Sequence, residues 1–151
     1  MTVPLNPAFT GRTYEAAAYL VGREKVREFA TAVGERSPLS HEVAAAQAAG
    51  YRDLVAPVTF AIIVHFAAMN PAIADPELGL DYSRLVHGTQ EFSYRRPIIA
   101  GDELATVATI EEIRTRAGHD FLTVQAQARA DGELVVTTRS IVIIRGPEGQ
   151  S

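Results

Sequence analysis

Hydrophobic and polar positions follow a helical period in the first half of the chain and a strand period in the second half. Residues 23–33 carry one apolar stripe at helical spacing, and Gly34 follows it, so an amphipathic helix is predicted to end there. The stripe consists of Val26, Phe29, Ala30 and Val33. The alanine-rich residues 41–49 predict a second helix. The short apolar stretch 16–21 is expected to be an edge strand or an extended lead-in.

The most apolar part of the chain is the run of residues 58–69, directly after Pro57. Proline suits the first position of a helix, because its φ is fixed and the N–H that it lacks would have no helical partner there. A helix that is apolar nearly all round is normally buried. We therefore predict a buried helix over these residues, ending before the helix-breaking pair Asn70-Pro71.

Four β-rich runs follow residue 84 and are joined by short links. They cover residues 85–95, 102–114, 119–130 and 133–145. The pair Asp131-Gly132 is the strongest hairpin signal in the chain. Tight turns cannot join parallel neighbours, so an antiparallel meander is expected, packed against the apolar helix in an α+β architecture. Such a sheet leaves edge strands that dimerisation could cover.

Length, composition and charge narrow the class of protein. A chain of 151 residues that is 47% hydrophobic fits one domain over residues 1–151, with residues 146–151 expected to form a flexible tail. The absence of cysteine excludes disulfides, thiolate metal sites and a cysteine nucleophile. A net charge of −4 argues against nucleic acid and anionic membranes as partners. No signal peptide or membrane-length apolar run is present, so we expect a cytoplasmic protein.

The polar side chains with the clearest chemical potential gather in residues 34–42. Glu35 and His41 are six residues apart across a loop and could converge on one water. Histidine transfers protons near neutral pH, and a carboxylate can orient water or act as the second acid or base. The alternative is that Glu35 is solvated and that Ser40 or His41 caps the next helix.

Other candidate sites have weaker support in the sequence. His65 is either a satisfied core histidine or a polar group that lines a ligand tunnel. The four histidines show no metal-ligand spacing, and no glycine-rich nucleotide motif is present, so no metal and no cofactor are expected. The pair Arg95-Arg96, together with Arg84 and Arg114, could contact the phosphates of coenzyme A or of a carrier-protein pantetheine, or it could be a solvated strand edge.

Several segments of the chain resemble the MaoC-like (R)-specific enoyl-thioester hydratases and (3R)-hydroxyacyl-thioester dehydratases, above all their short actinobacterial subunits. The resemblance spans about residues 11–145 and rests on residues 21–30, 48–51, 55–60, 86–92 and 96–102. It implies a single hot-dog domain, in which a long antiparallel sheet wraps around a central apolar helix. It also implies a role in fatty acid metabolism, a dimer with active sites between subunits, and an acyl thioester of coenzyme A or acyl carrier protein as substrate.

The catalytic pattern of that family reads Gly-Asp-x-Asn-Pro-aliphatic-His, and this chain departs from it. Gly34 and Pro38 match, while Glu35, Ser37 and Ser40 stand at the Asp, Asn and His positions, and His41 comes one residue late. A one-residue offset at a helix start turns a side chain by about 100°. The family also has a glycine at the start of the central helix, whose N–H meets the thioester carbonyl. Here that stretch reads Ala56-Pro57-Val58, and proline has no N–H.

Carried over residue by residue, the resemblance implies that Glu35 and His41 are the catalytic pair. It implies a substrate-binding set of Val58, Thr59, Phe60, Val64, His65 and Arg95. The altered pattern favours a subunit that shapes the acyl tunnel beside a motif-intact hydratase partner. The alternative is a self-sufficient homodimeric hydratase or dehydratase. A hot-dog thioesterase is disfavoured because residues 58–69 contain no acid, and a non-enzymatic acyl-binding module is the remaining reading.

Overall fold

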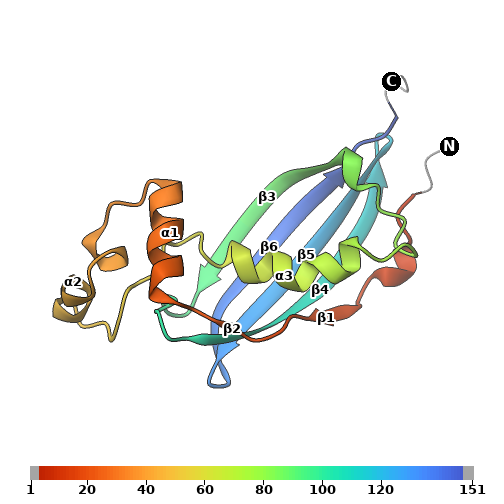
Figure 1. The fold of residues 1–151 in the computed structure, drawn as a ribbon. Helices are drawn as coiled ribbons and strands as arrows, with labels where there is room; N and C mark the ends of the chain where they lie inside the picture. The colour runs from red at the N-terminus through yellow and green to blue at the C-terminus, as the bar shows by residue number, and fades with distance from the viewer. Residues whose placement is uncertain (1–3, 148–151) are drawn as a thin grey trace.

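A six-stranded antiparallel sheet carries one long helix across one face, and a small helical lobe extends beyond the end of the sheet (Figure 1). The computed structural model describes residues 4–147. The arrangement confirms the expected α+β hot-dog architecture. Of the tail expected over residues 146–151, the part from residue 148 onward lies outside the described residues. No helix within residues 4–147 has the length and apolarity needed to cross a membrane.

The elements follow one another in a simple order. The strands are β1 (Thr13–Glu15), β2 (Tyr19–Leu20), β3 (Leu85–Tyr94), β4 (Glu103–Arg116), β5 (His119–Ala130) and β6 (Glu133–Ile144). The helices are α1 (Arg23–Val33), α2 (Val43–Ala48) and α3 (Ile62–Ile73), with short 3₁₀ turns η1 (Pro7–Phe9), η2 (Pro38–Ser40) and η3 (Tyr82–Arg84). The four long strands confirm the four β-rich runs, whereas β1 was not expected from the sequence.

The order of the strands differs from the expected four-strand meander. β4, β5 and β6 are consecutive neighbours, but β3 pairs with β6 at the far edge instead of with β4. The expectation is wrong because the outer edge of β4 is already occupied. β1 and β2 both pair with it, through Thr13 opposite Thr109 and Tyr19 opposite Leu104. The outer edge of β3 has no strand partner among the described residues.

The core lies between α3 and the face of the sheet that it covers. Every second residue of β4 points inward and is buried, from Leu104 to Ile110, as the alternation of a half-buried strand requires. The inward positions beneath the helix include the small side chains of Ala108 and Ala126. Small residues there let the helix pack closely on β4 and β5.

Helix α3 begins four residues later than the sequence predicted. Val58 is 74% exposed and lies in a turn before the helix, so the expected start at this position is wrong. In a helix that began there, the Val58 carbonyl would accept from the N–H of Ile62. Instead it accepts a hydrogen bond of 2.8 Å from the Tyr94 hydroxyl, and the N–H of Ile62 donates to the Thr59 carbonyl. A tertiary contact thus displaces the helix start.

The far end of α3 also differs from the prediction, because the helix continues through Pro71 to Ile73. Proline within a helix removes the bond to the carbonyl four residues earlier, here that of Ala67. Ala67, Asn70 and Pro71 are all exposed, so water can satisfy that carbonyl. The helix is therefore buried along one side and open along another, not buried all round as expected.

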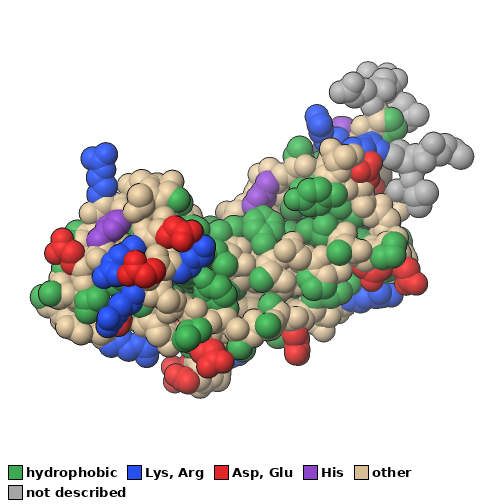
Figure 2. Space-filling view, in the orientation of Figure 1, with side chains coloured by type: hydrophobic (Ala, Val, Ile, Leu, Met, Phe, Trp, Pro, Cys, Tyr) green, Lys and Arg blue, Asp and Glu red, His purple; other side chains and the backbone are tan. Residues whose placement is uncertain are grey.

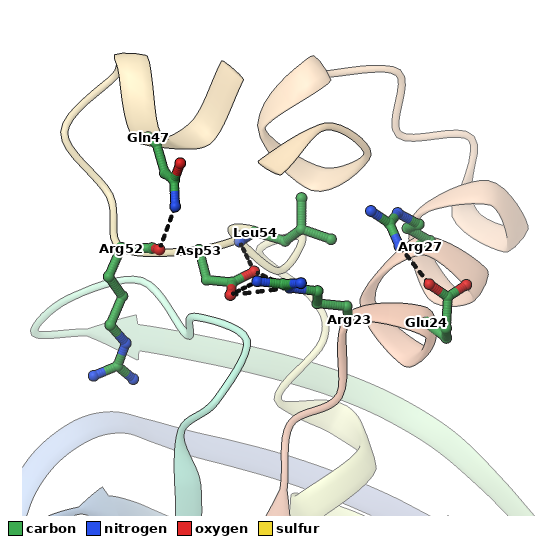
Figure 3. Close-up of polar contacts among 7 residues, drawn as sticks. All are labelled: Arg23, Glu24, Arg27, Gln47, Arg52, Asp53 and Leu54. Carbon is green, nitrogen blue, oxygen red and sulfur yellow. Dashed lines mark hydrogen bonds and ion pairs between the residues drawn. The ribbon is translucent and has the colours of Figure 1, made fainter. Parts of the chain in front are cut away.

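The helical lobe consists of α1, η2, α2 and the segment 49–53 that follows α2. The bounds of α1 confirm the predicted helix, and Gly34 ends it in the left-handed conformation at φ 74°. Helix α2 is shorter than the predicted 41–49, and its N-terminal cap is Glu42 without a side-chain hydrogen bond, so neither Ser40 nor His41 caps it. The lobe is fastened internally by Arg23, whose guanidinium donates to both carboxylate oxygens of Asp53 (Figure 3).

Candidate functional site

Two pockets lie in the part of the molecule where the sequence placed its candidate residues. The first, here called the junction pocket, has a volume of about 330 Å³ and is lined by Val55, Ala56, Val58, Tyr94, Arg95, Arg96 and Pro97. The second, the lobe pocket, has a volume of about 440 Å³ and is lined by Thr31, Gly34, Glu35, Arg36 and His41. In the space-filling view the molecule is hollowed between the helical lobe and the sheet (Figure 2).

The candidate residues divide between these two pockets. Glu35 and His41, the candidate catalytic pair, line the lobe pocket. Val58 and Arg95, from the candidate substrate-binding set, line the junction pocket. The two linings share no residue. Within a single chain, the candidate acid/base pair therefore faces a different cavity from Val58 and Arg95.

Glu35 and His41 are close together, but each is held by backbone groups. The Nε2 of His41 lies 2.7 Å from the backbone carbonyl oxygen of Glu35, not from its carboxylate. A carbonyl only accepts, so Nε2 carries the proton of this hydrogen bond and Nδ1 is the acceptor nitrogen of the neutral ring. The Oε1 of Glu35 accepts from the N–H of Ser37 at 2.8 Å. The pair has the right chemical types for acid/base catalysis in the lobe pocket.

Ser40, at the position where the family pattern has histidine, is hydrogen-bonded to a residue that lines the junction pocket. Its hydroxyl donates a 2.6 Å hydrogen bond to the carbonyl of Val55, a lining residue, and only 3% of the residue is exposed. The N–H of Val55 in turn donates to the Leu39 carbonyl at 2.9 Å. These two bonds join η2 to the wall of the junction pocket. The side chain at the family's histidine position is thus a buried hydroxyl, which cannot serve as a base near neutral pH.

The bond between Ser40 and Val55 makes a prediction about stability. Replacing Ser40 by alanine leaves the Val55 carbonyl without this donor, and such losses cost about 1–2 kcal/mol of unfolding free energy. Urea unfolding of Ser40→Ala should show this loss. Thr31→Ala, at an exposed helix position, is the control and should change the free energy by less than about 0.5 kcal/mol. Equal stability of Ser40→Ala and the wild type would contradict the assigned hydrogen bond.

The floor of the junction pocket is the turn that precedes α3. Pro57 has no N–H, but the N–H groups of Val58 and Thr59 have no backbone acceptor within residues 4–147. Burial raises the pKa of Tyr94 to about 12, against a smaller opposing effect of the Ala61 N–H, so its hydroxyl stays protonated and fixes the turn through the Val58 carbonyl. The turn therefore has two backbone N–H groups without a backbone acceptor in the described part of the chain, although the family's glycine is missing.

Asp102 is a residue of this region that the sequence reading missed as part of a site. Only 2% of it is exposed, and its carboxylate accepts from the Arg96 guanidinium at 2.8 and 3.0 Å, from Arg52, and from the N–H of Ile99 at 2.9 Å. Burial alone would raise the pKa of Asp102, but these hydrogen bonds and the two arginine charges outweigh it and hold the pKa below its usual value. In the sequence it stood out only as part of the segment 96–102 that resembles the dehydratase family.

The other proposed substrate-binding residues lie mainly in the core. Phe60 and Val64 belong to the apolar cluster beneath the lobe, and neither they nor His65 line the two pockets. His65 is fully buried, with Nδ1 2.6 Å from the Thr138 hydroxyl and Nε2 2.8 Å from the Ser140 hydroxyl. Both ring nitrogens are thus satisfied. The role of these three residues in an acyl tunnel stays a prediction.

Metal ligation finds no support in the described part of the chain. No three histidine, aspartate or glutamate side chains of residues 4–147 come together in an arrangement that could hold a metal ion. Several acidic and basic groups of the lobe are instead paired with one another, as Arg27 is with Glu24 (Figure 3).

Comparison with known proteins gives a consistent picture. Residues 8–138 match the family model described as FAS1-like, dehydratase domain region. A UPF0336 protein of Saccharopolyspora erythraea is 51% identical over 154 residues, which cover 98% of this chain and 99% of that protein. A chain of the C-terminally truncated HadBC (3R-hydroxyacyl-ACP dehydratase) complex of Mycobacterium tuberculosis is 30% identical, with a TM-score of 0.80 over 89% of this chain and 96% of its own length. A MaoC-like dehydratase is 35% identical with a TM-score of 0.85 over 93% of this chain, but this chain spans only 43% of it.

Proposed function

The chain belongs to the FAS1-like dehydratase-region family of hot-dog proteins, and from this premise we propose that it is the tunnel-shaping subunit of a (3R)-hydroxyacyl-thioester dehydratase or (R)-specific enoyl hydratase. Its substrate would be an acyl thioester of coenzyme A or acyl carrier protein. The addition or removal of water needs acid/base groups and no redox cofactor. In this proposal a partner subunit supplies the intact Asp/His pair, and this chain binds and encloses the acyl arm.

The observation that carries the proposal is the bond between Ser40 and Val55. The family pattern requires an imidazole at this position, beside the substrate, and this chain has a buried hydroxyl there. His41 is turned away into the lobe pocket, where it is bonded to the Glu35 carbonyl. Catalytic groups must be placed to within about half an ångström, so a histidine in another pocket does not replace the missing one.

The similar HadBC chain supports an arrangement with a partner subunit, because that dehydratase is described as a complex. In this chain, the exposed edge of β3 is the surface on which such pairing would occur. It is ten residues long and has no strand partner among the described residues. Native proteins rarely leave a long edge strand uncovered.

We therefore expect two subunits whose sheets join along β3. Light scattering should give the mass of a dimer, either of two copies of this chain or of this chain with its hydratase partner. A change of Gln90 to proline within β3 should weaken the association because proline disrupts an edge strand's ladder. A stable monomer at micromolar concentration, both alone and with the partner, would contradict the assembly.

One observation favours the alternative of a self-sufficient homodimeric hydratase. Glu35 and His41 line the same cavity, and the Nδ1 of His41 is available as an acceptor. If the acyl arm of a substrate bound by a second copy lay in the lobe pocket, the side chains of Glu35 and His41 would be within reach of the reacting water. This arrangement would need the lobe pocket, not the junction pocket, to hold the thioester.

A product assay with a short enoyl thioester tests the proposal against the other readings. The chain is assayed alone and after co-expression with a hydratase subunit that carries the intact pattern. Water addition without thiol release only in the complex supports the subunit role. Water addition by the pure chain supports the homodimeric alternative, and thiol release would indicate a thioesterase. If no preparation forms either product, only the acyl-binding module remains, and the subunit role is refuted.

A further inference from the structure

The lining of the junction pocket combines an apolar wall with two guanidinium groups and contains no carboxylate. The apolar part is formed by Val55, Ala56, Val58 and Pro97, and the cations are Arg95 and Arg96. The chain as a whole carries a net charge of −4, whereas the lining of this pocket is positively charged. Arg95 is exposed, and its guanidinium forms no hydrogen bond or ion pair within residues 4–147.

Arg96 is held in place from behind by the buried Asp102. Two parallel hydrogen bonds of 2.8 and 3.0 Å join its guanidinium to the two oxygens of that carboxylate. This fork arrangement fixes the plane of the guanidinium. A third bond, from Arg96 to the carbonyl of Pro97 at 2.9 Å, adds to the constraint. The side chain is thus oriented before any ligand arrives, which lowers the entropy cost of binding.

The positive charges beside Asp102 outnumber its single negative charge. Arg52 also donates to it from the lobe, so two guanidinium groups share one carboxylate and one positive charge is left over. Asp131 and Glu133, on the hairpin between β5 and β6, lie close enough to Arg96 to contribute to its raised pKa, after the larger effect of Asp102. Neither forms an ion pair with Arg96, and neither lines the pocket.

We propose that Arg95 and Arg96, with Arg96 oriented by Asp102, bind the phosphate of the pantetheine arm at the junction pocket. This inference rests on the proposed function, because it assumes an acyl thioester as ligand. Guanidinium groups match phosphate oxygens in geometry and charge. A pantetheine thioester has its phosphate at one end and its thioester at the other, with a thin, largely uncharged chain between them. The apolar wall suits that chain, and Val58, whose N–H has no backbone acceptor within residues 4–147, is itself a lining residue.

The same contacts could instead serve only to clamp the lobe to the sheet. Arg52 belongs to the lobe, whereas Asp102 directly precedes β4, and their ion pair joins the two parts. In Figure 3 the Arg52 side chain extends away from Gln47 and Asp53. A clamp alone would contribute to stability and would leave ligand affinity independent of phosphate. Phosphate dependence of binding therefore separates the two roles.

The test is to measure by calorimetry the affinity of the chain, alone and in its complex, for 4′-phosphopantetheine and for pantetheine. In the wild-type protein the phosphate should improve affinity by about tenfold or more, the usual scale for a charge-assisted contact. Arg96→Gln and Arg95→Gln should each reduce that ratio to about threefold or less. Arg116→Gln is the matched control, since it removes one exposed arginine charge at the far end of β4, and it should keep the wild-type ratio.

Asp102→Asn separates orientation from charge. Removing a negative charge near a phosphate should by itself improve binding. Loss of the two hydrogen bonds that orient Arg96 should instead weaken it. A lower ratio of the affinities for 4′-phosphopantetheine and pantetheine in a folded Asp102→Asn protein therefore supports the positioning role. Should Arg96→Gln or Asp102→Asn fail to fold, Arg95→Gln still decides, because Arg95 has no partner within residues 4–147. Equal affinity of the wild type for the two probes, or a ratio unchanged in Arg95→Gln and Arg96→Gln, would overturn the proposal.

Two further comparisons identify the source of the phosphate and separate this inference from the proposed function. Coenzyme A binding tighter than 4′-phosphopantetheine would assign a nucleotide-bearing arm, and faster turnover of the carrier-protein thioester would assign the carrier. If the complex hydrates pantetheine and phosphopantetheine thioesters with equal kcat/KM, the subunit role stands and the phosphate site is wrong. If binding depends on phosphate but no preparation has hydratase activity, the site stands and the proposed function is wrong.

Discussion

The purified chain is expected to add water to an enoyl thioester at least about 10²-fold more slowly than its complex with a motif-intact hydratase subunit. In this reaction a water must be held against the β-carbon while a proton reaches the α-carbon, so a carboxylate and an imidazole must be set together. At the position of the family's histidine the chain has only the buried hydroxyl of Ser40, and losing a general acid or base costs about 10²–10⁴-fold. The rates are compared at equal active-site concentration with a short enoyl thioester.

Substitutions in the complex show which subunit carries the chemistry. Glu35→Gln and His41→Ala should each leave kcat within about threefold, because both residues face the lobe pocket. Replacing the histidine of the partner's intact pattern should reduce kcat by about 10²-fold or more. If Glu35→Gln or His41→Ala reduces kcat by that amount instead, and the homodimer turns over substrate, the self-sufficient enzyme is the correct reading.

Acidification from pH 7 to pH 4 is expected to lower the free energy of unfolding by about 3 kcal/mol through His65 alone. Burial, and to a lesser degree the charge of His87, lower the pKa of His65 from 6.5 to about 4. Between these two values the unfolded chain binds a proton that the folded chain excludes, so protonation favours unfolding. The contribution is fully present above pH 6.5 and is lost as the pH falls toward 4.

Unfolding by urea at several pH values checks this prediction. His65→Gln should be less stable than the wild type at pH 7, because the hydroxyls of Thr138 and Ser140 lose their fitted partner. Its stability should nevertheless fall less steeply between pH 6.5 and pH 4. His119→Gln, at a partly exposed position, is the control and should keep the wild-type slope. An unchanged slope in His65→Gln would show that another group causes the acid sensitivity.

The elements whose signals are local could be predicted from the amino-acid pattern. The apolar stripe of residues 23–33 and Gly34 gave the bounds of α1, because helix periodicity and a left-handed terminus depend on neighbouring residues only. The four long strands were equally clear from β-rich runs, and Asp131-Gly132 forms the expected hairpin turn with positive φ at both residues. The resemblance of scattered motifs to the dehydratase family was also present in the sequence.

Long-range contacts determine how these elements meet and which pocket each candidate residue faces. The start of α3 depends on Tyr94, which is 36 residues away and takes the Val58 carbonyl from the helix. The place of β3 depends on β1 and β2, because these two strands occupy the outer edge of β4. The Ser40 hydroxyl is held by the Val55 carbonyl, whereas His41 lines the lobe pocket. The Asp102 carboxylate binds Arg52, which is 50 positions away in the chain. Such long-range contacts leave no local pattern, since they arise from packing between segments that are distant in the chain.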